Sequence, residues 1–169
     1  MAGTTVPRTV TPVGADGAEL HFLPLLAHLA RVGSRAAEGA LGPTGLRPRH
    51  LVALTLLSNH GAASQQGLAE ALRLDPSNVV GLLNELEERG LVTRRRDPDD
   101  RRRHIVELSA RGAESLALAH CRIAGAEEEL LRALSPAERV TLHALLVRAA
   151  GDRLPAHPCL AAAAEDVGC

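Results

Sequence analysis

Apolar residues recur at the spacing of an α-helix along most of this chain, and glycine, proline and serine residues divide the pattern into segments. The first segment extends over Leu20–Leu41 and ends before Gly42 and Pro43, a pair that stops a helix. The second extends over about Pro48–Ser58, with an apolar stripe formed by Leu51, Leu54 and Leu57. Both segments are therefore predicted to be helices.

A short helix and a longer one follow, separated by a brief connection. Ser64 is placed to cap the short helix, which extends through Leu72. Asp75 and Pro76 then occupy the N-cap and first helical positions of the longer helix, which continues to Arg89. A glycine, the residue that commonly ends a helix, follows directly. This arrangement is typical of a helix-turn-helix unit.

A hairpin and two further helices follow in the pattern. β-prone residues flank a charged turn, which predicts a two-stranded hairpin over about 91–108. Ser109 is placed to cap a long helix through about Leu134. Ser135-Pro136-Ala137-Glu138 forms a complete capping box and opens a final helix to about Ala150. Residues 1–17 and 151–169 have little periodicity, so we expect a flexible N-terminal arm and a loose C-terminal tail.

The helix that begins at Pro76 has two distinct faces. On a helical wheel the apolar side chains gather on one side, namely Val79, Leu82, Leu83 and Leu86. The other side begins with small or polar residues, namely Ser77, Gly81, Asn84 and, at the margin, Asn78, and it also carries the later glutamates Glu85 and Glu88. A helix in the major groove of DNA needs such small side chains, because its first turns must approach the base edges. Gly81 fits this interpretation, since a glycine inside a helix costs about 1 kcal/mol relative to alanine.

The predicted hairpin is the most charged part of the chain. Residues 94–103 hold six arginines and three aspartates around Pro98. The aspartates occupy the turn and the arginines flank it, so a carboxylate such as that of Asp100 can brace a neighbouring guanidinium. Charge runs are usually solvated surface, and an amphipathic helix with a polar outer face is ordinary by itself. Together, however, an arginine-rich hairpin and a helix with short side chains on its polar face favour binding to DNA. The arginines suit contacts with phosphates and with the narrow minor groove.

Composition narrows the remaining choices. The 169 residues suffice for one domain, and 46% hydrophobic content with one phenylalanine and no tyrosine or tryptophan favours helices packed through aliphatic side chains. The net charge is −1, yet six of the 19 basic residues lie within residues 94–103, so positive charge is concentrated at the hairpin and diluted elsewhere. The three cysteines are not spaced like metal ligands, and Cys121 is expected to be a buried structural thiol. The sequence also contains no catalytic motif. We therefore expect no enzyme, metal or cofactor, and the lack of a signal or membrane-spanning pattern predicts a cytoplasmic protein.

From about Leu20 to Ala150, these residues resemble the multiple-antibiotic-resistance regulator (MarR) family of bacterial transcription factors. The most specific stretch begins at Ser64-Gln65-Gln66-Gly67-Leu68-Ala69 and continues through Asp100-Arg101-Arg102 to Leu108-Ser109. The resemblance implies a mainly α fold, a winged helix-turn-helix of six helices and a two-stranded β-wing. It also implies an obligate homodimer within residues 18–150. Dimerisation helices would lie in 18–47 and 109–150, and the DNA-binding part in 48–108.

By the same resemblance we expect a ligand-responsive repressor that binds a pseudo-palindromic operator in double-stranded DNA. The residues expected at the DNA are Ser64, Gln65, Ser77, Asn78, Gly81, Asn84, Arg94, Asp100, Arg101 and Arg102. A small anionic or aromatic effector would bind between the dimer and DNA-binding parts. The candidate effector contacts are His21, His28, Arg31, Arg35 and His50.

Other interpretations of the candidate effector residues and of the function stay open. Histidine and arginine suit an anionic ligand, but the same residue types are common on surfaces and in helix packing. Family members that sense peroxide use a cysteine near the N-terminus, and this chain has none there. The alternative function is a winged-helix protein-interaction module without sequence-specific DNA binding.

Overall fold

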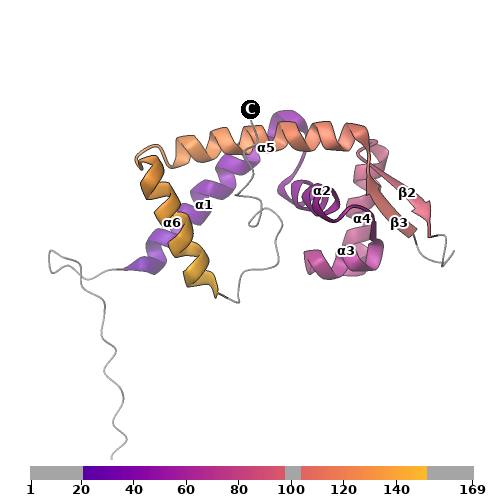
Figure 1. Cartoon of the computed structure of the whole chain (residues 1–169), viewed down its shortest axis with the longest axis horizontal. Coiled ribbons are helices and arrows are strands. Elements are labelled where there is room, and N and C mark those ends of the chain that lie inside the picture. The colour runs from indigo at the N-terminus through magenta and orange to yellow at the C-terminus, as the bar shows by residue number, and fades with distance from the viewer. Residues whose placement is uncertain (1–20, 98–103, 152–169) are drawn as a thin grey trace, which may run out of the picture.

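The computed structural model describes residues 21–97 and 104–151, which form a mainly helical structure with a small antiparallel sheet. The elements are α1 (Phe22–Leu41), the 3-10 turn η1 (Gly42–Thr44), α2 (Pro48–His60), β1 (Ala63–Ser64), α3 (Gln65–Leu72), α4 (Pro76–Glu88), β2 (Val92–Arg96), β3 (His104–Leu108), α5 (Ala110–Leu130) and α6 (Pro136–Ala150). In Figure 1, α1 and α6 lie at one end of α5, and α2, α3, α4 and the strands lie at the other. The predicted mainly helical winged fold is confirmed, whereas the predicted arm and nearly all of the tail lie outside the described residues.

Serine caps determine where three helices begin. The hydroxyls of Ser64, Ser109 and Ser135 each accept the backbone N–H three residues further on, at the starts of α3, α5 and α6. At α6 the Glu138 carboxylate also accepts the Ser135 N–H (2.8 Å), which completes the predicted capping box. These three predictions are confirmed. The predicted start of α4 is confirmed as well, with Asp75 at the N-cap and Pro76 at the first helical position, although the Asp75 side chain makes no capping hydrogen bond.

Gly90 ends α4 and directs the chain into the hairpin. Its φ of +68° is a left-handed conformation that favours glycine. The Gly90 N–H donates to the Glu87 carbonyl (2.8 Å), and the Leu91 N–H donates to the Leu86 carbonyl (2.9 Å). This pair of bonds is a Schellman motif, which satisfies carbonyls that the helix end leaves open. The predicted glycine stop is therefore confirmed.

The sheet has three strands in the order β1-β3-β2. Strands β2 and β3 form the predicted antiparallel hairpin, with Val92 opposite Leu108 and Arg96 opposite His104. On the other edge of β3, the two-residue strand β1 pairs antiparallel, with Ala63 opposite Val106. The sequence did not predict this third strand, because two residues carry no readable alternation. The tip of the hairpin, residues 98–103, lies outside the described residues.

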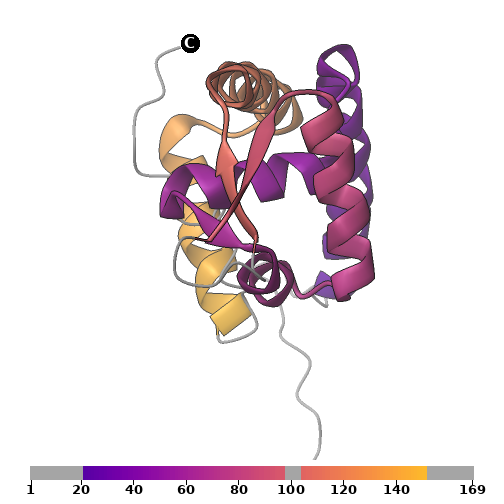
Figure 2. The ribbon, with the colours of Figure 1, turned by 90° about the vertical axis from the view of Figure 1, so that its right-hand side faces the viewer.

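The core lies between α2, α4, the hairpin and the first half of α5. The apolar stripes predicted for α2 and α4 are both buried, as expected. The core side chains with an exposed fraction of only 0–1% include Leu54, Leu57, Val79, Leu83, Leu86, Val92 and Val106. Figure 2, seen from this end of the molecule, shows β2 and β3 in front of α2. Burial of one face of α4 leaves its opposite face open.

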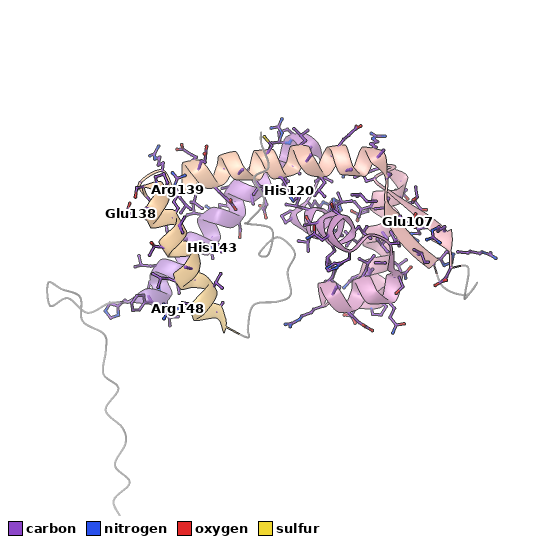
Figure 3. All side chains as sticks on the ribbon, in the orientation of Figure 1. Glu107, His120, Glu138, Arg139, His143 and Arg148 are labelled. Atoms are coloured by element: carbon purple, nitrogen blue, oxygen red, sulfur yellow. The ribbon has the colours of Figure 1, made fainter. Side chains whose placement is uncertain are left out.

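Helix α5 contacts both the core around α2 and α4 and the helix α1. Leu116 and Ala119 in its first half are buried in the core, and the helix also packs extensively against α1. His120, labelled in Figure 3, lies on α5 with its Nε2 3.2 Å from the hydroxyl of Thr55 on α2. The helix ends at Leu130 rather than near Leu134 as predicted, because the chain turns there towards α6.

Cys121, the next residue on α5, corrects a further expectation. Its side chain is half-buried and disulfide-bonded, so it is not a buried free thiol. Cys159 and Cys169 lie outside the described residues. Neither the spacing nor the number of the cysteines in the sequence indicated this bond.

Gly112 allows α5 to begin against the base of the hairpin. A Cβ at this position would overlap the carbonyl oxygen of Leu91 and lie 2.8 Å from the Leu108 side chain. Ser109 donates its hydroxyl to the Gly90 carbonyl (2.7 Å) and its N–H to the Leu91 carbonyl (3.1 Å). The end of α4, the hairpin and the start of α5 therefore meet in one tightly packed junction.

We expect Gly112→Ala to lower the free energy of unfolding by about 2 kcal/mol, because the backbone at this junction must move to admit a methyl group. Gly125→Ala on the same helix is the matched control, since a Cβ there meets no atom within 4 Å. Because alanine has a higher helix propensity than glycine, Gly125→Ala should leave the free energy of unfolding unchanged or raise it by up to about 1 kcal/mol. Chemical denaturation followed by circular dichroism compares the two variants. Equal stability would show that the junction tolerates a side chain.

Candidate DNA-binding surface

The exposed face of α4 carries the four residues that the helical wheel placed there. Ser77, Asn78, Gly81 and Asn84 are all exposed, and a Cβ on Gly81 would meet no atom within 4 Å. The opposite face packs on α2, α3 and β2. This face of α4 is therefore polar and exposed, it carries short side chains, and it lies over the buried core.

The two candidate residues on the preceding helix have different surroundings. Ser64 and Gln65 are both half-buried at the start of α3. The Ser64 hydroxyl accepts the Gly67 N–H (3.0 Å) and so serves the helix cap. Gln65 occupies the first turn of α3, where backbone N–H groups have no partner within the helix.

The two faces of β2 differ in what their arginines contact. Arg94 lies on the same face as the buried Val92, and only 17% of its side chain is exposed. Arg95 lies on the opposite face, where its Nε donates to Glu107 across the hairpin (2.7 Å). Figure 3 labels Glu107 on β3. The other predicted wing residues, Asp100, Arg101 and Arg102, lie outside the described residues.

Arg94 and Asn84, which were each predicted to contact DNA, are in contact with each other. A terminal nitrogen of Arg94 donates to Asn84 Oδ1 (2.7 Å), and its Nε lies 3.2 Å from a carboxylate oxygen of Glu87. The guanidinium thus joins the hairpin to two successive turns of α4. A helical wheel of α4 cannot reveal this contact, because one partner lies outside the helix.

Glu85 joins α4 to the start of α2. Its carboxylate accepts from Arg49 (2.5 Å) and from His50 Nε2 (2.9 Å), and Arg47 lies 3.8 Å away. The hydrogen bonds from Arg49 and then from His50 lower the pKa of Glu85 below its ordinary value. The charge of Glu85 is therefore largely balanced by cationic groups on α2.

His50 is held in one tautomer. Its ring is buried, and its Nδ1 accepts the Arg47 N–H at the start of α2 (3.2 Å), so Nε2 carries the proton that it donates to Glu85. Burial lowers the pKa of His50, and this effect exceeds the opposing influence of Glu85. The residue expected at an effector site thus also caps α2 and fastens it to α4.

Arg89 makes a further attachment that the sequence did not suggest. At the end of α4 it donates to the carbonyls of Gly45 (2.9 Å) and Thr44 (3.1 Å). These carbonyls lie in the segment that links α1 to α2. Helix α4 is therefore fastened to the hairpin, to α2 and to the connection from α1.

The remaining candidates for effector contacts lie at the start of α1 or along it. His21 precedes the helix, and His28, Arg31 and Arg35 are exposed on it, with His28 Nδ1 and Arg31 3.4 Å apart. His50 belongs to α2, and its ring bonds with Arg47 and Glu85 instead. The structure therefore brings two of the five candidates into direct contact.

Two adjoining grooves of about 200 and 610 Å³ lie between α1 and α5. Ala36, Ala126 and Leu130 line both, and none of the five effector candidates lines either. Within residues 21–97 and 104–151, no three His, Cys, Asp or Glu side chains are arranged to hold a metal ion. In the same part of the chain, no helix combines the length and apolarity needed to cross a membrane.

Comparison with known proteins gives consistent results. The family model described as MarR family matches residues 46–104. Over 104 residues the chain is 36% identical to a transcriptional regulatory protein for the hcr operon of Thauera aromatica, a match that covers 62% of this chain. It spans 63% of the length of that relative.

Two solved structures are similar over more of their length. A MarR-family transcriptional regulator from Rhodococcus sp. RHA1 superposes with a TM-score of 0.63 at 32% identity, covering 75% of this chain and 89% of that one. CouR from Rhodococcus jostii RHA1, bound to p-coumaroyl-CoA, superposes with a TM-score of 0.62 at 30% identity, covering 77% of this chain and 91% of that one.

Acidification is expected to lower the free energy of unfolding. Burial lowers the folded-state pKa of His50 and of His120 below the ordinary value of 6.5. Below that value the unfolded chain binds more protons than the folded one, so this contribution to stability is complete above about pH 7 and is lost progressively as the pH falls from 6.5 through the lower pKa values of the folded state. Thermal unfolding of the wild type across this range measures the loss. The double variant His50→Gln, His120→Gln should show a shallower dependence, and an unchanged dependence would contradict the assignment.

Proposed function

Because this chain belongs to the MarR family of DNA-binding transcriptional regulators, we propose that it is a repressor controlled by a small effector. It binds a pseudo-palindromic operator as a homodimer, and the effector changes its affinity for that operator. A bound repressor dimer would occupy DNA that the transcription machinery needs. The proposal assigns residues 48–108 to DNA binding and the helices in 18–47 and 109–150 to dimerisation, between an arm at 1–17 and a tail at 151–169.

The observation that carries the proposal is the open face of α4 beside the hairpin. Ser77, Asn78 and Gly81 lie in the first turns, where a helix in the major groove approaches base edges most closely. Small side chains permit that approach, and serine and asparagine both donate and accept hydrogen bonds. We assign Ser64 and Gln65, at the start of α3, to positioning on the DNA backbone.

The charges around α4 support this assignment. Glutamates late in the helix would by themselves repel phosphates, but Glu85 is paired with Arg49 and His50, and Glu87 with Arg94. Two of the three glutamates late in the helix are therefore compensated, and the third, Glu88, is exposed at its last residue, furthest from the first turns that approach the bases. We propose that Arg101 and Arg102, braced by Asp100, extend from the hairpin into the adjacent minor groove.

The apolar side chains of α1 and α6 support a homodimer. Leu23 is 80% exposed, Leu25 65% and Val140 71%, and further leucines on both helices are about half exposed. Apolar surface of this extent on two helices usually marks an interface. Two copies would place two α4 helices about one turn of DNA apart, which matches the symmetry of a pseudo-palindrome.

An effector would act by binding more tightly to one arrangement of the two copies than to the other. CouR is bound to p-coumaroyl-CoA, and for this chain we propose a small anionic or aromatic effector. His21, His28, Arg31 and Arg35 are the proposed contacts, whereas the buried His50 is less suited because both ring nitrogens are engaged. Operator titrations with p-coumaroyl-CoA and simple arylcarboxylates as probes test this response. Unchanged operator affinity with every such probe would contradict it.

The wild-type protein is expected to bind DNA from upstream of its own gene with a preference over unrelated DNA, as measured by fluorescence anisotropy. The variant Arg101→Ala, Arg102→Ala should weaken binding to all sequences, because it removes two phosphate or minor-groove contacts. It should also reduce the slope of log K against log salt by about 1 to 2. Arg95→Ala, which removes a surface pair with Glu107, is the matched control. Failure of the wild type to prefer any sequence would leave the protein-interaction module as the better function.

Gly81→Ala is expected to change stability and DNA affinity in opposite directions. The new methyl group meets no protein atom, so the helix should gain up to about 1 kcal/mol. On the DNA the same methyl group would fill space needed for close approach, and we expect operator affinity to fall about tenfold, or about 1.4 kcal/mol. Thermal unfolding and anisotropy measure the two effects. Unchanged affinity would show that this turn of α4 stays away from the bases.

A further inference from the structure

Arg94 occupies an unusual place for an arginine on a DNA-binding hairpin. The alternation of β2 places it on the face of Val92, which is buried, and that strand packs on α4. Its side chain is only 17% exposed, whereas that of its neighbour Arg95, on the other face, is 49% exposed. The guanidinium therefore lies against the helix that would read DNA, instead of extending from the hairpin.

The contact with Asn84 determines the orientation of the asparagine amide. A guanidinium has only donors, so the atom that it contacts at 2.7 Å must be the amide oxygen. The amide nitrogen of Asn84 is consequently directed away from Arg94, on an exposed side chain of α4. An asparagine in the open would sample both orientations, and fixing one lowers the entropy lost when it binds a partner.

Glu87 makes Arg94 a poor anchor for a phosphate. The carboxylate lies 3.2 Å from Arg94 Nε and is 44% exposed, so it balances much of the guanidinium charge. Nε and one terminal nitrogen of Arg94 are engaged in these contacts, and with 17% of the side chain exposed, only the remaining donors are left for a phosphate. The two contacts together suit an arginine that orients a neighbouring side chain.

We infer that Arg94 is a positioning residue for base recognition: it holds the Asn84 amide so that its NH2 group donates to an acceptor on a base edge in the major groove. The acceptors available there are O6 and N7 of guanine, N7 of adenine and O4 of thymine. This inference rests on the proposed function, and it replaces the direct DNA contact expected for Arg94. It makes Asn84 a determinant of sequence preference that depends on the hairpin.

A double-mutant cycle on operator binding tests the inference. Arg94→Met keeps the aliphatic stem that packs on α4 and removes the guanidinium, Asn84→Ala removes the amide, and the third variant combines both. Each single variant should weaken operator binding about tenfold, and the double variant should be no more than about twofold weaker than either. Binding to unrelated DNA and the salt slope should stay at wild-type values in Arg94→Met. Circular dichroism and thermal unfolding confirm that each variant is folded.

Arg94→Lys separates charge from geometry. Lysine keeps the positive charge but lacks the planar fork that contacts Asn84 and Glu87 together. It should therefore resemble Arg94→Met, while the control Arg95→Ala retains sequence preference.

Three results would overturn the inference while the wild type still binds its operator. They are losses that multiply to about a hundredfold in the double variant, rescue by lysine, and a salt slope reduced by about 0.9 in Arg94→Met. Each would indicate that Arg94 acts independently of the Asn84 amide, and the last two would indicate that it contacts a phosphate itself. A wild-type protein without any sequence preference would instead refute the proposed function, and this inference with it.

Discussion

The attachment of α4 to three neighbouring segments is the constraint on which the rest of the structure depends. Its apolar face is buried in the core, but burial alone would leave the helix free to rotate or slide slightly. Polar contacts remove that freedom at successive turns. Asn84 accepts a hydrogen bond from Arg94 of the hairpin, and Glu87 forms an ion pair with the same guanidinium. Glu85 bonds to α2, and Arg89 bonds to the segment after α1. A helix that reads base edges must hold its side chains to within a fraction of an ångström, so this anchoring bears directly on function.

The same contacts resolve an electrostatic difficulty. The chain has a net charge of −1 and carries glutamates on the helix proposed to meet a polyanion. Glu85 is paired with Arg49 of α2 and Glu87 with Arg94 of the hairpin, so each of these glutamates has a cationic partner from a different element. Exposed ion pairs of this kind contribute little to stability, about 0–1 kcal/mol each. In the proposed complex with DNA, their larger effect would be to lower the repulsion between α4 and the phosphates while they set its position.

The sequence predicted what local periodicity and capping control. The two faces of α4, the stop at Gly90 and the capping box at Ser135 all depend on residues within one or two turns of each other, and all are confirmed. The strand β1 depends on pairing with β3, which lies far along the chain, so its two residues gave no signal. His50 and Glu85 are 35 residues apart, and a sequence pattern gives no indication that they share a hydrogen bond.

Arg94 illustrates the same limit at the candidate site. Counting arginines around the hairpin treats all of them as equivalent, yet the pleat of β2 sends Arg94 towards α4 and Arg95 towards Glu107. The alternation of side chains along a strand was available in the sequence, but its phase was not, because it depends on which face of the hairpin meets the helix. The charge of Arg94 made it a candidate for contact with DNA, whereas its partners make it a candidate for control of Asn84. The distinction matters for specificity, since phosphate contacts supply affinity without sequence information, while an oriented amide can distinguish one base pair from another.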